Sequence, residues 1–83
     1  MATEAHLLLF HTAGCHLCEL AEALALPLAA ARGVRVELQD IAGSEELEAL
    51  YGTRIPVLRD PASSREIGWP FGEREVLALL EGL

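Results

Sequence analysis

The stretch "HLLLFHTAGCHLC", residues 6–18, joins an apolar run to two cysteines three positions apart. Residues 6–11 show no polar alternation in their apolar centre, which is typical of a strand buried on both faces in the middle of a sheet. The residues that follow, Thr12 to Gly14, have the composition of a turn, and Cys15 then stands where a helix begins. The stretch therefore predicts a central strand, a turn and a helix that starts at the cysteine pair.

A helical pattern of apolar residues follows Cys15 and ends near Gly33, where glycine is a common helix terminator. Its members recur at spacings of three and four, and they are Leu17, Leu20, Ala21, Leu24, Leu28 and Ala31. Pro27 lies inside this pattern, where it removes an amide donor and presses on the carbonyl of Ala23. We therefore expect a kink or a break of the helix at Pro27.

The middle of the chain predicts a second strand and a second helix. Residues 34–40, "VRVELQD", alternate between apolar and polar side chains, which indicates an edge strand with one solvent-exposed face. Ser44 is suited to cap a short helix that ends near Tyr51, before Gly52. The buried sides of these two elements are expected to carry Val34, Val36 and Leu38, and Leu47, Leu50 and Tyr51.

The last third of the chain predicts a hairpin and a C-terminal helix. Pro56 opens the strand "VLRD", "DPASS" supplies turn residues, and "REIG" can pair back on that strand. The C-terminal helix is marked by Val76, Leu79, Leu80 and Leu83. A right-handed crossover makes the first two strands parallel and the tight turn makes the last two antiparallel. The 83 residues thus predict a single α/β domain, residues 1–83, with a mixed four-stranded sheet in the order β-α-β-α-β-β-α.

Composition and charge restrict the partners of this domain. Hydrophobic residues make up 52% of the chain, and 13 acidic residues against 6 arginines give a net charge of −7. Such a charge repels phosphate backbones and anionic lipids, so we expect neither nucleic acid nor membrane as a partner. The apolar run near the N-terminus is too short for a secretion signal and no basic segment precedes it, so we expect a cytoplasmic protein. We also expect it to be a monomer.

The cysteine pair is the centre of the expected chemistry. A helix N-terminus presents unpaired amides that favour an anion, so the Cys15 thiolate is stabilised there and the thiol pKa is lowered. Cys18 lies one turn further along and can attack a mixed disulfide formed on Cys15. We therefore assign Cys15 as the nucleophile and Cys18 as the resolving thiol of a thiol-disulfide oxidoreductase.

Two other interpretations of this region concern histidine and metal. His16 is either a solvent-exposed residue without a role or a redox-tuning residue that favours the thiolate. His11, Cys15, His16 and Cys18 are suitable ligand types for zinc or copper, but no second pair at ligand spacing accompanies them, so no metal site is assigned. The alternative function is a non-catalytic binding module or a metal carrier.

The segments "FHTAGCHLC" and "YGTRIPVL", about forty positions apart, together resemble a glutaredoxin-like protein of the thioredoxin superfamily. The resemblance covers nearly the whole chain and implies a thioredoxin-like fold with helices on both faces of the sheet. It also implies that Pro56 is cis and lies beside the cysteine pair, with the backbone of Ile55 offered to a substrate peptide in strand-like pairing. The implied role is in cell redox homeostasis.

Departures from the resembled pattern concern the substrate. Glutaredoxins usually carry a lysine three residues before the first cysteine, where this chain has Thr12, and a Gly-Gly-Asp segment where it has "GWPFGE". In the resembled family these residues hold glutathione. Trp69 would narrow the glutathione groove, while Arg54 could supply one positive charge in place of the missing lysine. We expect a disulfide-bearing protein or a small thiol as substrate and an external reductant. No bound cofactor is required, and glutathione as the reductant is disfavoured by these departures.

Overall fold

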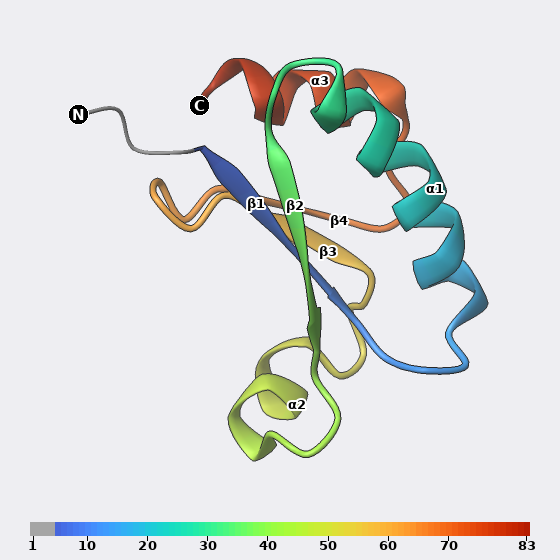
Figure 1. Cartoon of the computed structure of the whole chain (residues 1–83). Helices are drawn as coiled ribbons and strands as arrows, with labels where there is room; N and C mark the ends of the chain where they lie inside the picture. Colours follow the sequence, from blue (N-terminus) through green and yellow to red (C-terminus); the bar gives the residue numbers. More distant parts are fainter. Residues whose placement is uncertain (1–4) are drawn as a thin grey trace.

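The order of the helices and strands is the predicted one. The structure is a computed structural model that describes residues 5–83 of the chain. The elements are β1 (His6–His11), α1 (His16–Ala30), β2 (Arg35–Asp40), α2 (Glu45–Tyr51), β3 (Val57–Arg59), β4 (Glu66–Gly68) and α3 (Glu73–Glu81). Figure 1 shows the start of β1 and the C-terminus on the same side of the molecule, with α2 at the opposite end.

The four strands form one mixed sheet in the order β2-β1-β3-β4. β1 pairs in parallel with β2 and antiparallel with β3, and β3 pairs antiparallel with β4. The predicted central position of β1, the edge position of β2 and the β3–β4 hairpin are therefore confirmed.

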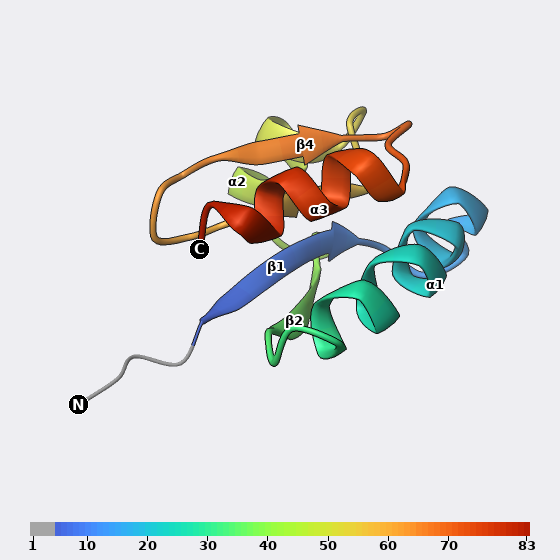
Figure 2. The ribbon, with the colours of Figure 1, turned by 90° about the horizontal axis from the view of Figure 1, so that it is seen from above.

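Helices cover both faces of the sheet because side chains of a strand point alternately to opposite faces. Leu7 and Leu9 of β1 join the larger apolar cluster, to which α1 and α3 contribute Ala21, Ala25 and Leu79 among others. Phe10 of β1 joins a smaller cluster on the α2 side, whose other buried members are Ile41, Tyr51 and Val57. Figure 1 shows α1 and α3 together and α2 apart from them, and Figure 2 shows α3 alongside β4.

The buried face of α1 differs from the predicted stripe. The buried residues are Cys18, Ala21, Ala25 and Ala29, whereas Leu17 and Leu20 are 45% and 44% exposed and Ala31 lies beyond the helix. Leu24 and Leu28 pack only at the side of the core. Nearly every position of α1 after Glu22 is apolar, so periodicity alone could not select among overlapping stripes. The sheet selects the alanine face.

Of the kink or break predicted at Pro27, the break is wrong, because α1 continues through this residue to Ala30. Pro27 and Ala23, whose carbonyl would have bonded to the missing amide, both lie on exposed positions of the helix. Water can bind a carbonyl that faces solvent, so the lost hydrogen bond does not end the helix there.

Three leucines predicted to be buried are exposed. Leu38 lies on edge strand β2, which has a neighbour on one side only, and Leu83 follows the end of α3. Leu50 is 53% exposed because α2 is two turns long and contacts the sheet mainly through Leu47 and Tyr51. The predicted cap is confirmed, since the Ser44 hydroxyl accepts a hydrogen bond from the Leu47 amide at 3.2 Å.

Candidate functional site

The cysteine pair lies where the sequence predicts it, at the N-terminus of α1. Gly14 ends the turn after β1 with a φ of +78°, a conformation that glycine adopts readily. Cys15 is the N-cap residue, with extended backbone, and its Sγ accepts a hydrogen bond from the Cys18 amide at 3.1 Å. Cys15 and Cys18 are joined by a disulfide with their Cα atoms 5.2 Å apart.

The two sulfurs differ in their access to solvent. Cys15 is partly exposed, whereas Cys18 is 3% exposed and belongs to the buried face of α1. A thiol or disulfide arriving from solvent can therefore reach the sulfur of Cys15 and not that of Cys18. This asymmetry follows from the helix, because residue 18 faces the sheet while residue 15 stands before the first turn.

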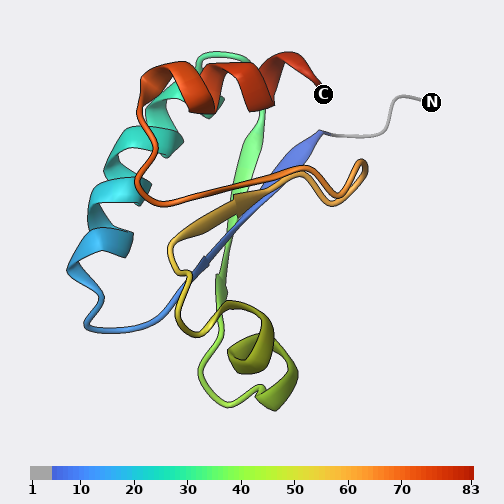
Figure 3. The ribbon, with the colours of Figure 1, turned by 180° about the vertical axis from the view of Figure 1, so that it is seen from behind.

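The register of the sheet places Pro56 and Trp69 at the same end as the cysteines. Phe10 pairs with Val57 and Val57 pairs with Gly68. The next residues out form a row beyond the strand ends, and in it the Trp69 amide donates to the Pro56 carbonyl at 3.1 Å. The Ile55–Pro56 and Trp69–Pro70 peptide bonds are both cis. Figure 3 shows the start of α1 and the loop before β3 at one end of the sheet.

The backbone of Ile55 is only partly available to a substrate. Its amide donates to the Tyr51 carbonyl at 3.1 Å, and the Arg54 amide donates to the same carbonyl at 2.8 Å. The chain thus continues the last turn of α2 up to residue 55. Strand-like pairing needs both the amide and the carbonyl of a residue. In this conformation the expected pairing at Ile55 is limited to its carbonyl.

Arg54 forms an ion pair with Glu66, a residue that the sequence analysis did not select. Arg54 Nη2 donates to Glu66 Oε1 at 2.5 Å, and its guanidinium lies 5.2 Å from the centre of the Tyr51 ring. Glu66 Oε2 also accepts from the Tyr51 hydroxyl at 3.1 Å and from Arg59 Nη1 at 2.9 Å. We call Tyr51, Arg54, Arg59 and Glu66 the Glu66 cluster.

The hydrogen bonds of the Glu66 cluster lower the pKa of the Glu66 carboxylate. The hydrogen bond from Arg54 is the largest influence that lowers the pKa of Glu66, and hydrogen bonds from Arg59 and Tyr51 act in the same direction against burial. The hydrogen bond that Arg59 donates to Glu66 likewise raises the pKa of Arg59. Glu66 could have been identified from the sequence, because Arg59 and Glu66 carry opposite charges and pair directly in the β3–β4 register.

The other predicted site residues lie around this end of the sheet with different exposures. Trp69 is partly buried and packs edge to face on Phe71, with ring centres 5.2 Å apart, against the cluster under α1 and α3. Thr12 is partly exposed in the turn before the cysteines, and His16 is exposed on the first turn of α1. Trp69 is therefore held mainly by packing.

Within residues 5–83, no group of three or more His, Cys, Asp or Glu side chains is arranged to hold a metal ion. The sulfurs of Cys15 and Cys18, two of the four ligand candidates, are joined to each other in the disulfide. None of the helices in the described part of the chain has the length and apolar character needed to cross a membrane.

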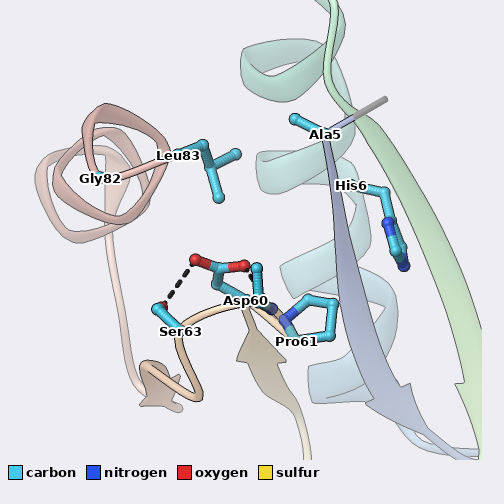
Figure 4. Close-up of a pocket in the computed structure, with 8 residues that line it drawn as sticks. Ala5, His6, Asp60, Pro61, Ser63, Gly82 and Leu83 are labelled. Atoms are coloured by element: carbon cyan, nitrogen blue, oxygen red, sulfur yellow. Dashed lines mark hydrogen bonds between the residues drawn. The ribbon is translucent and has the colours of Figure 1, made fainter. Parts of the chain in front are cut away.

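A surface groove of about 550 Å³ lies at the other end of the sheet, between the start of β1, the hairpin turn and the C-terminus. Its one buried polar residue, Asp60, accepts from the Ser63 hydroxyl at 2.7 Å and from the Ala62 amide at 3.0 Å. These bonds, the Ser63 one foremost, lower the pKa of Asp60. Figure 4 shows the His6 ring pointing away from that carboxylate. Asp60 therefore stabilises the hairpin turn to which it belongs.

Comparison with known proteins finds a matching family and solved relatives, of which two are described. The family model "Glutaredoxin-like domain (DUF836)" matches residues 6–81. Protein XcR50 from X. campestris, solved by X-ray diffraction, is 39% identical over 93% of this chain and 97% of its own, with a TM-score of 0.74. The match to the solution structure of the same protein covers 94% of that chain, with a TM-score of 0.75.

Protein Ne2328 from Nitrosomonas europaea, solved by NMR, is 29% identical over 94% of this chain and 92% of its own, with a TM-score of 0.75. No curated protein matches the chain. The expected glutaredoxin-like resemblance and the thioredoxin-like fold are thereby confirmed.

Proposed function

The chain belongs to the glutaredoxin-like domain family, and on that premise we propose that it is a thiol-disulfide oxidoreductase in which Cys15 attacks and Cys18 resolves. The observation that carries the proposal is the Cys15–Cys18 disulfide at the N-terminus of α1, with the first sulfur accessible and the second buried. An amide of the first turn already points at the Cys15 sulfur and would stabilise its thiolate.

The reaction balances with the two cysteines and a substrate disulfide. The Cys15 thiolate attacks one sulfur of the substrate, a bond forms between them, and the other substrate sulfur leaves with the electron pair and takes up a proton. The Cys18 thiol loses its proton and attacks the Cys15 sulfur, which releases the second substrate thiol. The substrate gains two electrons and two protons, and the cysteine pair is oxidised to the disulfide.

An external thiol completes the cycle. One thiolate attacks Cys15 of the disulfide and expels the Cys18 thiolate, and a second thiolate removes the first as a new disulfide. No bound cofactor enters these steps. We propose that the protein acts as a monomer in the cytoplasm on a disulfide-bearing protein or small molecule, since reducing compartments supply such thiols and favour catalytic over structural cysteine pairs.

Alkylation and two single variants test this assignment. Iodoacetamide labelling against pH should give Cys15 a pKa below the ordinary value of about 8.5. Cys15→Ser should abolish reduction of a disulfide substrate, whereas Cys18→Ser should accumulate a mixed disulfide on Cys15 that mass spectrometry detects. An ordinary Cys15 pKa together with full activity of Cys15→Ser would contradict the proposal.

The redox-tuning role of His16 and the choice of reductant need separate assays. His16→Ala should shift the reduction potential of the pair, because an imidazolium beside Cys15 favours the thiolate; an unchanged potential and Cys15 pKa would exclude this role. A coupled assay should regenerate the protein more slowly with glutathione than with a thioredoxin-type reductant. Equal rates would contradict the interpretation of Thr12 and Trp69.

A further inference from the structure

The loop that carries Ile55 and Pro56 depends on one carboxylate of a neighbouring strand. Building on the proposed function, we propose that Glu66 is a positioning residue that holds the α2–β3 loop, residues 52–56, for binding of a disulfide-bearing peptide. The polar partners of the Glu66 carboxylate within residues 5–83 are Tyr51, Arg54 and Arg59, and not the cysteines. Its effect on substrate would pass through Tyr51 and Arg54.

The contacts of Glu66 grip the loop from two sides. Oε1 accepts from Arg54, which lies within the loop, while Oε2 accepts from the hydroxyl of Tyr51, the last residue of α2. Arg59 of β3 donates to Oε2 as well, so the same carboxylate is fixed to the sheet. One side chain thus connects the end of α2, the loop and two strands.

Glu66 and Arg59 are better protected from water than an ordinary surface ion pair, with side chains 22% and 29% exposed. Arg54, the partner within the loop, is more open to solvent, with a side chain 48% exposed. By contrast, Arg35 and Glu37 on the edge strand β2 approach only to 3.9 Å, with side chains 60% and 50% exposed. Charged hydrogen bonds that are partly shielded contribute more than exposed pairs. The Glu66 contacts therefore add to the apolar anchorage of the loop, in which Pro56 is fully buried and Ile55 packs against the smaller apolar cluster.

The loop conformation decides which backbone group faces a substrate. The amides of Arg54 and Ile55 are both bound to the Tyr51 carbonyl, so the turn is closed on itself. Among residues 5–83, no donor reaches the carbonyl of Ile55. That carbonyl is the group left to accept from a peptide amide, and its direction is set by the turn that Glu66 holds between Tyr51 and Arg54.

The cysteine chemistry should be independent of Glu66 itself, which acts on the loop from the Tyr51 side. Cys18 lies on α1, whose neighbours belong to the apolar cluster on the opposite face of the sheet from Tyr51. Loss of Glu66 should therefore weaken binding of a substrate that has a peptide backbone and leave a small disulfide unaffected. This difference separates positioning from a general loss of structure.

The experiment compares Glu66→Ala and Arg54→Met with the control Glu37→Ala, which removes one carboxylate from the other edge of the sheet. For a disulfide-bearing peptide, KM should rise about tenfold in Glu66→Ala, as expected for lost hydrogen bonds to a charged group, with kcat unchanged. KM for hydroxyethyl disulfide and the Cys15 alkylation pKa should not change. Glu66→Gln, which keeps an acceptor for Arg54, should show a smaller rise.

Amide hydrogen exchange gives a second readout that does not depend on turnover. In Glu66→Ala and Arg54→Met the Ile55 amide should exchange faster, while the Ala21 amide in the core of α1 should not. Arg54→Met keeps the test usable if Glu66→Ala does not fold. An unchanged peptide KM in a variant of an active protein overturns this inference alone. Failure of the wild-type protein to reduce either disulfide overturns the proposed function and the inference with it.

Discussion

The two faces of the sheet are stabilised by different kinds of contact. The face under α1 and α3 holds the larger apolar cluster, with Leu7, Leu9 and Leu58 fully buried. The face under α2 holds the smaller one, where Phe10 and Tyr51 stack with ring centres 4.2 Å apart. The remaining attachment of that side comes from the charged hydrogen bonds of the Glu66 cluster.

This difference divides the site into a fixed part and an adjustable part. The cysteines lie at the N-terminus of α1, which packs on the apolar face, and the cluster there contains no titratable side chain. The loop with Pro56 is attached through the Glu66 cluster on the α2 side, where protonation of the carboxylate or a single substitution can change the geometry of the loop. Under the proposed function, the chemistry and the recognition of a substrate can therefore vary separately.

The largest effect is expected from a cavity in the apolar face. Leu9→Ala should lower the free energy of unfolding by about 2–5 kcal/mol, because the side chain is fully buried and its neighbours can relax only in part. Urea denaturation of the oxidised protein at pH 7 measures this change. The matched control Leu50→Ala removes the same atoms from an exposed position of α2 and should change the free energy by less than about 0.5 kcal/mol. Equal costs for the two variants would remove the proposed difference between the faces.

A smaller and pH-dependent effect is expected from Glu66→Gln. The pKa of Glu66 is lowered in the folded protein, so its carboxylate stabilises the fold above the unfolded pKa of about 4.3 and this stabilisation is lost as pH falls through the folded pKa. At pH 7 the variant should be less stable by about 1–2 kcal/mol.

Denaturation at several pH values checks the sign of this effect. The difference between Glu66→Gln and wild type should shrink as the pH falls below about 4, because the wild-type carboxylate is then protonated as well. Glu37→Gln, in the exposed pair with Arg35, should cost less than about 0.5 kcal/mol at any pH. A difference for Glu66→Gln that grows toward acid pH would contradict the direction of the shift.

The smallest effect is expected at the start of α2. Ser44→Ala removes the acceptor for the Leu47 amide and should cost about 1 kcal/mol. Hydrogen exchange at the Leu47 amide should accelerate, while the Ala25 amide in α1 keeps its protection. Faster exchange in both helices would mean that the two faces unfold together.

Most of the fold was predictable because its signals are local. Ser44 placed the start of α2, the turn residues between Asp60 and Ser64 placed the hairpin, and the apolar run of residues 6–11 placed the central strand. Cys15 and Cys18 followed from the same local order of strand, turn and helix. Each of these features depends on residues within a few positions of one another.

The errors concern which side of an element is buried. In α1, leucines and alanines both recur at helical spacing, and the structure buries Ala25 and Ala29 instead of Leu17 and Leu20, while Ala21 is buried as predicted. Glu66 was not selected because its partners Tyr51 and Arg54 are fifteen and twelve residues away. Such choices depend on the distance between a helix and the sheet, which no local pattern encodes.

The amino-acid order alone determined where the helices and strands begin and placed a cysteine pair at the head of the first helix, because backbone capping and side-chain periodicity act over a few residues. Tertiary packing decided that Cys18 is covered while Cys15 stays accessible, and that Ile55 keeps only its carbonyl free. It also decided that Glu66 grips the loop before Pro56. These features need surfaces from distant parts of the chain to meet, and only the folded sheet brings them together.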